Sequence, residues 1–296
     1  MLDTQDLIDG RLSPAQQARY WDQGFLHPMQ AVSAQQAASW RAEFEAMERD
    51  WLTADLPLPL NSYKRMNANV VMPLAAEMGR HPAILDVVEG VLGPDIMLFG
   101  VEFFIKEPNT THVVTMHQDL TYWGLGEIDG LVTAWLALSP ATSASGCMDM
   151  VAGSHKNPIL AHKDSDDANN LLSRGQEVAV DVAPEDLTAV ELQPGQMSLH
   201  HGLMIHGSGP NTSQDRRIAA VLRYLRPDMA KQVGGKDYAR LVRGEDRHNN
   251  FHPVPEPDSL FAPEALALHD DIRRLQASVM MRGAASQGYF AKEGDA

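Results

Sequence analysis

The sequence is poor in cysteine, in positive charge and in long hydrophobic segments. Its single cysteine, Cys147, excludes a disulfide framework and any zinc site built from several thiolates. Only 24 lysines and arginines oppose 39 acidic residues, and the net charge of −15 disfavours nucleic acids and anionic membranes as partners. No apolar run reaches about 18 residues, so we expect no membrane span. The acidic N-terminus lacks the apolar stretch of a signal peptide, which predicts a cytoplasmic protein.

The middle of the chain differs from its two ends. Residues 95–227 carry eight short, β-rich apolar runs separated by turn signals, a succession typical of a β-sandwich, jelly roll or barrel. Residues 1–94 show helix-capping signals before amphipathic stretches, and residues 228–296 hold a charged loop and one more helical pattern. The sequence therefore predicts a single domain, residues 1–296, with a mainly β core and helical additions at both ends.

The pattern His-x-Asp, which can supply two metal ligands, occurs at residues 117–119, 162–164 and 269–271. On a strand, residues i and i+2 point to the same side and can bind one ion, whereas on a helix they lie about 200° apart. The last copy falls in a predicted helix and the second in a polar loop. His117 and Asp119 end a strand-like run, THVVTMHQDL, so only this copy is expected to bind metal.

A second histidine-rich run, SLHHGLMIH, offers the remaining ligand. A site of two histidines and one carboxylate needs one more histidine and leaves coordination positions open for substrate and dioxygen. If the strand is regular, His200 and His206 share one face and His201 lies on the other. Spacing alone does not choose between His200 and His206.

Two adjacent arginines, Arg216 and Arg217, open the next predicted strand. A buried arginine is costly unless it pairs with an anion, and its planar fork matches a carboxylate. One of the two would suit the distal carboxylate of a 2-oxo acid. The alternation of the strand does not say which of them faces the interior.

Three segments in this order carry a resemblance: HQDL at 117–120, AGSHK at 152–156, and HGSGPN at 206–211 followed by an arginine at 217. Together they resemble the phytanoyl-CoA dioxygenase family, and the similarity covers roughly residues 25–227. Members of this family are Fe(II)- and 2-oxoglutarate-dependent oxygenases. The resemblance implies a double-stranded β-helix, the cupin-like jelly roll, packed by the N-terminal and C-terminal helices.

The resemblance also assigns roles to individual residues. It implies that the catalytic iron ligands are His117, Asp119 and His206, which settles the choice between the two histidines. It implies that Arg217 binds 2-oxoglutarate. Further cosubstrate contacts are expected, with a looser match, from Ser208, Trp135 and Phe103.

Substrate contacts are expected from residues near the triad, namely Tyr122, Trp123, His201 and Arg223. Core packing is an alternative reading of the two aromatic residues, and a salt bridge is an equally good reading of Arg223. His201 also fits a packed histidine. The N-terminal cosubstrate contacts, around Lys64-Arg65, stay undefined at this stage.

The implied reaction is hydroxylation of a small molecule, with dioxygen as oxidant and with conversion of 2-oxoglutarate to succinate and CO2. Two alternatives stay open from the sequence. One is a cupin-type metalloenzyme that does not use 2-oxoglutarate, and the other is a desaturase, epimerase or cyclase with the same iron site. The sequence does not identify the substrate, and it leaves open a homo-oligomer.

Overall fold

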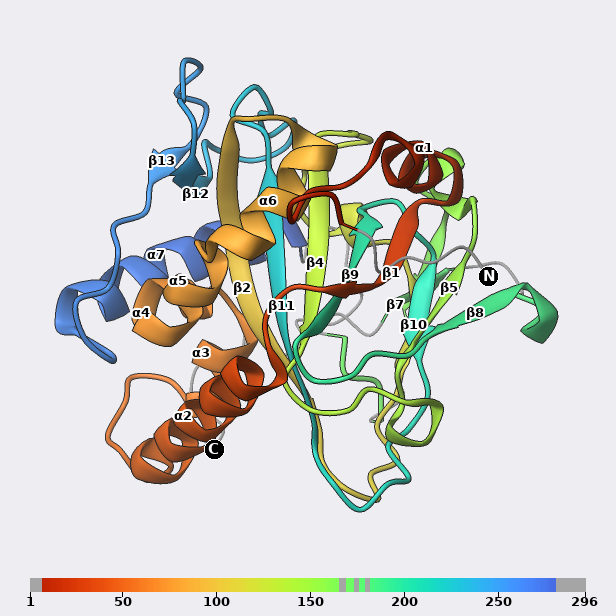
Figure 1. Ribbon diagram of the computed structural model, residues 1–296. Coiled ribbons are helices and arrows are strands. Elements are labelled where there is room, and N and C mark those ends of the chain that lie inside the picture. Colours follow the sequence, from red (N-terminus) through yellow and green to blue (C-terminus); the bar gives the residue numbers. More distant parts are fainter. Residues whose placement is uncertain (1–6, 165–168, 173–175, 179–181, 281–296) are drawn as a thin grey trace.

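The computed structural model describes residues 7–164, 169–172, 176–178 and 182–280. Within these residues the chain forms two larger β-sheets, and most helices cover the outer face of the larger one (Figure 1). The larger sheet has the strand order β1 (Phe25–Gln30), β9 (Gln196–His201), β4 (Leu131–Ala137), β11 (Arg217–Leu225), β2 (Ile96–Lys106), β12 (Tyr238–Arg243) and β13 (His252–Pro253).

The smaller sheet supplies the other wall of the sandwich. Its order is β3 (Val114–His117), β10 (His206–Ser208), β5 (Met148–Val151) and β8 (Leu187–Val190). A further two-stranded sheet pairs β6 (His162–Asp164) with β7 (Gln176–Val178). The segment of β6 is therefore a short strand, where the sequence predicts a polar loop.

The first two helices begin where the capping signals of the sequence place them. The side chains of Ser13 and Ser33 accept hydrogen bonds from backbone N–H groups three residues later and cap the first two helices. None of the helices in the described part of the chain is long and apolar enough to cross a membrane. In chain order they are α1 (Pro14–Gln23), α2 (Ala34–Trp51), α3 (Leu60–Arg65), α4 (Ala68–Val71), α5 (Pro73–Gly79), α6 (Pro82–Leu92) and α7 (Pro263–Met280).

Alternation along β11 decides which residues reach the space between the sheets. Ile218, Ala220 and the following even-numbered residues pack with the helices in the main core. Ala219 and Val221 instead join the cluster that includes residues of β5 in the smaller sheet. Because side chains alternate across a strand, Arg217 at the start of β11 lies on this inner face.

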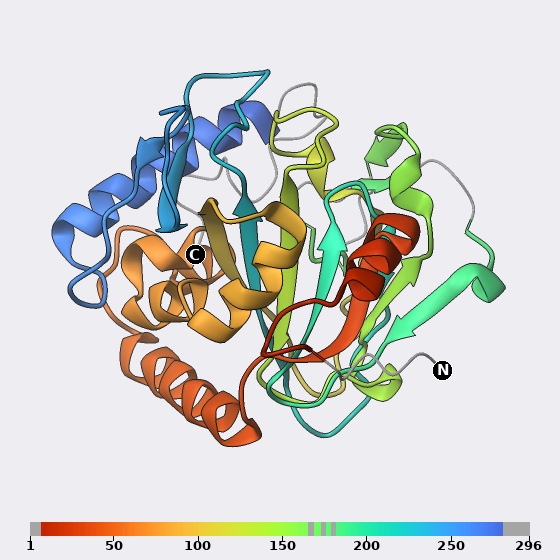
Figure 2. The ribbon, with the colours of Figure 1, turned by 45° about the horizontal axis from the view of Figure 1, so that its top comes forward.

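Three strands, β1, β12 and the short β13, lie outside the predicted β core of residues 95–227. β1 pairs antiparallel with β9 at one edge of the larger sheet, and β12 pairs antiparallel with β2. The N-terminal part is thus not purely helical. Pro28 conceals β1 in the sequence, because proline lacks the N–H that a central strand needs and only an edge strand tolerates that loss. Figure 2 shows β1 running beside β9, with α1 packed over them.

Candidate metal and cosubstrate site

Two strands of the smaller sheet bring the predicted metal ligands together. His117 ends β3 and lies opposite His206, the first residue of β10. Asp119 begins a single 3₁₀ turn, and Gln118 before it remains extended at φ −119° and ψ 126°. This extended residue keeps His117 and Asp119 on one side, as the His-x-Asp pattern requires. One ligand atom from each of the three side chains lies within 4.8 Å of the others.

Backbone carbonyls orient both imidazole rings. The Nδ1 atom of His117 donates to the carbonyl oxygen of Thr115 at 2.9 Å, and Nδ1 of His206 donates to that of Met204 at 3.0 Å. A carbonyl oxygen only accepts, so Nδ1 of each ring carries a proton. The lone pair of each Nε2 is then available to a metal, which is the role that such outer contacts have in metal sites.

The carboxylate of Asp119 completes the cluster. Its Oδ1 lies 3.4 Å from Nε2 of His117 and 4.0 Å from Nε2 of His206. Its Oδ2 accepts a hydrogen bond from Thr133 at 3.3 Å and lies 3.7 Å from Nε2 of His200. Burial opposes ionisation, but the surrounding histidines and the charge of Arg223 outweigh it and hold the pKa of Asp119 well below its usual range. The carboxylate is therefore ionised, as a ligand must be.

The cluster has the chemistry of a divalent iron site. All three side chains are buried, and burial together with the neighbouring His117 holds the pKa of His206 well below its usual range, so this ring stays neutral. In the described residues this is the one group of three or more ligating side chains that could hold an ion. Two imidazoles and one carboxylate fit Fe(II) and leave the remaining coordination positions open.

A buried arginine lies in the same pocket. Arg217 is 1% exposed, and its Nη1 donates to the carbonyl oxygen of Gly146 at 2.6 Å. Its guanidinium carbon lies 5.2 Å from the centroid of the Trp135 ring. Within the described residues Arg217 forms no ion pair, and its Nε has no hydrogen-bond partner. Burial lowers the pKa of Arg217 to about 10, so the group is still charged at neutral pH and suits an incoming carboxylate.

A buried lysine, which the sequence patterns do not reveal, lies behind Ser208. Lys106, the last residue of β2, is directly opposite Arg217 in the sheet and has no exposed surface. Its Nζ donates to Ser208 Oγ at 2.7 Å, to the Ser208 carbonyl oxygen at 3.2 Å, and to the carbonyl oxygen of Gly209. Burial and the charge of Arg217 lower the pKa of Lys106 to about 7.

The structure places most of the predicted site residues around one pocket between the two sheets. The same pocket is also lined by Phe104 and Glu102, which the sequence does not single out. Arg65, from the undefined pair Lys64-Arg65, and His200, which spacing leaves open as a ligand, line it too. The predicted residues that line it are His117, Asp119, His206, Arg217, Ser208, Trp135, Tyr122, Trp123 and Arg223.

The predicted contact from Phe103 is wrong. In the sheet Phe103 lies opposite Ala220, on the face that the helices cover, and its ring lies 4.2 Å from that of Phe44 in α2. The neighbouring Phe104 lies opposite Ala219 on the inner face and lines the pocket. The strand is visible in the sequence, but the face that turns inward depends on tertiary packing.

The predicted substrate contact from His201 is also wrong. His201 does not line the pocket; its Nε2 lies 3.2 Å from Asp129, and its Nδ1 accepts from the backbone N–H of Leu203 at 3.1 Å. His200 is the pocket residue, and its ring lies 4.8 Å from that of His206. The run SLHHGLMIH is two strands in different sheets, β9 and β10, and not one regular strand.

Arg223 has both of the roles that the sequence leaves open. It lines the pocket, and its Nη1 donates to Glu102 at 2.6 Å in a largely buried ion pair. Its guanidinium carbon lies 4.8 Å from the centroid of the Trp123 ring. Arg223, Glu102 and Trp123 therefore form one polar and aromatic group of the pocket.

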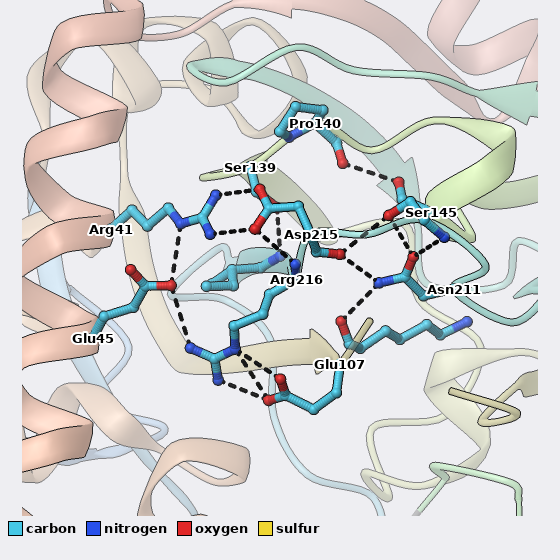
Figure 3. A network of polar contacts seen from close by, with 12 residues as sticks. Arg41, Glu45, Glu107, Ser139, Pro140, Ser145, Asn211, Asp215 and Arg216 are labelled. Atoms are coloured by element: carbon cyan, nitrogen blue, oxygen red, sulfur yellow. Dashed lines mark hydrogen bonds and ion pairs between the residues drawn. The ribbon is translucent and has the colours of Figure 1, made fainter. Parts of the chain in front are cut away.

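Arg216 has a different surrounding from Arg217. Its guanidinium binds Glu107 through Nε at 3.0 Å and Glu48 through Nη1 at 2.8 Å. Figure 3 shows it beside Glu45 and Glu107, with Arg41 bound to Asp215 nearby. This network ties α2 to the start of β11, outside the pocket, so the alternation of β11 leaves Arg217 as the arginine that faces the site.

Of the pair Lys64-Arg65, likewise, only one residue lines the pocket. Lys64 forms a salt bridge with Glu48 at 2.6 Å and does not line the pocket. Arg65 lines it, with its guanidinium carbon 3.8 Å from the centroid of the Phe104 ring.

The jelly roll and the buried His–Asp–His cluster define a class of protein, the metal-dependent enzymes with a facial triad in a β-sandwich. Comparison with known families identifies the group within this class. The family model of phytanoyl-CoA dioxygenase (PhyH) matches residues 20–219, and the chain belongs to that family. The resemblance seen in the sequence is thereby confirmed.

Individual relatives agree with this assignment. A probable phytanoyl-CoA dioxygenase of Caenorhabditis elegans is 25% identical over 249 residues, which cover 76% of this chain and 79% of the relative. The apo structure of the non-heme monooxygenase ThoJ is 30% identical, covers 90% of this chain and 97% of ThoJ, and has a TM-score of 0.80.

A second solved structure shows the same fold at lower identity. It is the epimerase SnoN in complex with Fe3+, alpha ketoglutarate and nogalamycin RO, 21% identical, with a TM-score of 0.58 and with 83% of this chain and 94% of SnoN covered. The predicted jelly-roll fold is confirmed.

Proposed function

We propose that this protein is an Fe(II)- and 2-oxoglutarate-dependent dioxygenase that hydroxylates a small-molecule substrate. One observation carries the proposal: a single pocket holds both a buried His–Asp–His cluster and a buried arginine that has no ion-pair partner among the described residues. Bound iron would supply dioxygen activation coupled to conversion of 2-oxoglutarate to succinate and CO2. Family membership supports this reaction class.

Different side chains would bind the two ends of the cosubstrate. His117, Asp119 and His206 would hold the metal, with the imidazole protons kept at Nδ1 by backbone carbonyls. Arg217 and Ser208 would bind the distal carboxylate, the first through its planar fork and the second through its hydroxyl. This division would account for a charged side chain that is buried at the start of β11 with no ion-pair partner in the described part of the chain.

The substrate would contact the remaining wall of the pocket. Tyr122 and Trp123 follow the metal-binding turn, and Arg223 contributes a charge paired with Glu102. A wall with aromatic faces and one ion pair suits a small molecule that carries both apolar and polar groups. Hydroxylation is proposed as the outcome, and product analysis distinguishes it from epimerisation, the activity named for SnoN.

Three further predictions from the sequence stand beside this proposal. They are a cytoplasmic location, one oxygenase domain over residues 1–296, and no nucleic-acid partner, the last because of the net charge of −15.

The test is anaerobic addition of Fe(II) and 2-oxoglutarate to metal-free protein, followed by visible absorbance. The chelate of a 2-oxo acid on Fe(II) gives a weak charge-transfer band, which we expect in the wild type. His117→Ala should abolish the band, whereas Arg216→Ala, whose side chain lies outside the pocket, should keep it. Tight metal binding without any band would contradict the proposal and favour a cupin-type enzyme that does not use 2-oxoglutarate.

A further inference from the structure

The buried ammonium group of Lys106 needs an explanation. The residue ends β2 with no exposed surface, and within the described residues it forms no ion pair. Placing a cation in a protein interior without a counter-ion is costly, and a lysine at a merely structural position would be replaced by an apolar residue at a gain in stability. The side chain of Asn211 donates to the Lys106 carbonyl oxygen at 3.0 Å, which fixes the backbone at this point.

The contacts of Lys106 all lead to the segment that follows the distal metal ligand. Its Nζ donates to the hydroxyl and to the carbonyl of Ser208, and to the carbonyl of Gly209. In its protonated form the amino group has three N–H donors, so these contacts then use all of them. Lys106 is also absent from the lining of the pocket, whereas Ser208 and Arg217 are both part of it. Any effect of Lys106 on a bound molecule must therefore pass through Ser208 or through its charge.

We propose that Lys106 is a positioning residue for the distal carboxylate of the cosubstrate, and that it acts by fixing Ser208. Because Ser208 Oγ accepts from Lys106, its own proton is free to be donated into the pocket. The carboxylate would then be bound by the fork of Arg217 and by the hydroxyl of Ser208, with the charge of Lys106 close behind. This inference rests on the proposed function, since it assumes a 2-oxo acid with a second carboxylate.

The test measures binding and not turnover. Fe(II)-loaded protein is titrated anaerobically with 2-oxoglutarate or with pyruvate, and the charge-transfer band gives the dissociation constant of each. Pyruvate has the same metal-chelating end but no distal carboxylate. We expect Lys106→Met to weaken 2-oxoglutarate binding about tenfold, because a hydrogen bond supported by a charge is worth about 1.5 kcal/mol or more. The affinity for pyruvate should be unchanged.

Three variants complete the design. In a Ser208→Ala background, Lys106→Met should have little further effect, because the contact through which it acts is already lost. Lys106→Gln retains an N–H donor for Ser208, so its affinity for 2-oxoglutarate should lie between those of the wild type and Lys106→Met. This variant replaces Lys106→Met in the test if the methionine variant fails to fold. Lys64→Met removes a lysine whose ion pair lies outside the pocket and should bind both acids as the wild type does.

The possible failures are distinguishable. If the wild type binds iron but gives no band with either acid, the proposed function fails. If the wild type gives a band and both Lys106 variants bind 2-oxoglutarate within twofold of it, the positioning role is refuted. Equal weakening of 2-oxoglutarate and pyruvate would also refute it, because the effect would then lie at the metal and not at the distal carboxylate.

Discussion

Replacing Arg217 by methionine should separate cosubstrate binding from folding. Burial lowers the pKa of Arg217 well below its usual range, to about 10, and at about 1.4 kcal/mol per pKa unit the charged form is disfavoured by about 3 kcal/mol in the free protein. Methionine does not carry this cost, although it leaves the carbonyl of Gly146 without the donor that now lies 2.6 Å away, a loss of about 1–3 kcal/mol. The two effects are comparable, so we expect the variant to be about as stable as the wild type.

The affinity for 2-oxoglutarate, unlike the stability, should fall strongly in Arg217→Met. A carboxylate in the fork of Arg217 would relieve the burial cost, and removing one partner of such a buried charge pair costs about 2–5 kcal/mol. A loss of about 3 kcal/mol corresponds to roughly a hundredfold increase in the dissociation constant. Arg217→Lys keeps a charge but loses the planar fork and should show a smaller increase, of about tenfold.

The assay is the anaerobic charge-transfer titration together with urea unfolding of the metal-free protein. Arg216→Met is the matched control, because the Arg216 side chain binds Glu48 and Glu107 outside the pocket. This control should lose some stability and keep its affinity for 2-oxoglutarate. The reasoning is refuted if Arg217→Met binds 2-oxoglutarate within threefold of the wild type.

Three further predictions follow from the histidines. Fe(II) should raise the thermal midpoint of the wild type and not of His206→Ala, as differential scanning fluorimetry with and without a chelator would show; an equal rise in both would contradict the ligand assignment. His201→Asn should lower the thermal midpoint without changing the charge-transfer band, because His201 contacts Asp129 and Leu203 away from the pocket, whereas His200→Asn should perturb the band. Burial lowers the pKa of His269 to about 4, below its usual 6.5, and its Nε2 is hydrogen-bonded to the Met66 carbonyl. Between these two pH values the unfolded chain takes up a proton that the folded protein does not. The free energy of unfolding is therefore highest above pH 6.5 and declines as pH falls toward 4. Between pH 7 and pH 5 the wild type should lose about 2 kcal/mol more than His269→Gln in urea unfolding, and equal losses would contradict this.

The elements that the sequence reveals are those with strong local patterns. The capped helices and the apolar run of β11 lie where the residues predict them, since capping and alternation are local properties. The short strand β1 is not predicted from the sequence, because Pro28 interrupts its pattern and its pairing with β9 is a long-range contact.

The site was predictable where its residues form a motif. The motifs around His117, Asp119 and His206 predict that they are metal ligands, and the structure brings all three together. Alternation alone could not choose between Phe103 and Phe104, because the inward face of β2 is set by the helices packed on the other side. The role proposed for Lys106 has no local signal, since it depends on contacts with Ser208 and Gly209, which are far from Lys106 in the sequence.

The central claim is that one pocket joins iron chemistry to a 2-oxo acid, and isotope labelling tests it most directly. Purified protein with Fe(II) and 2-oxoglutarate is exposed to ¹⁸O₂, and the succinate formed is examined by mass spectrometry. The account predicts succinate that carries one ¹⁸O atom in the wild type and none above background in His206→Ala. Iron-loaded wild-type protein that forms no labelled succinate, with or without candidate small-molecule substrates, would contradict it.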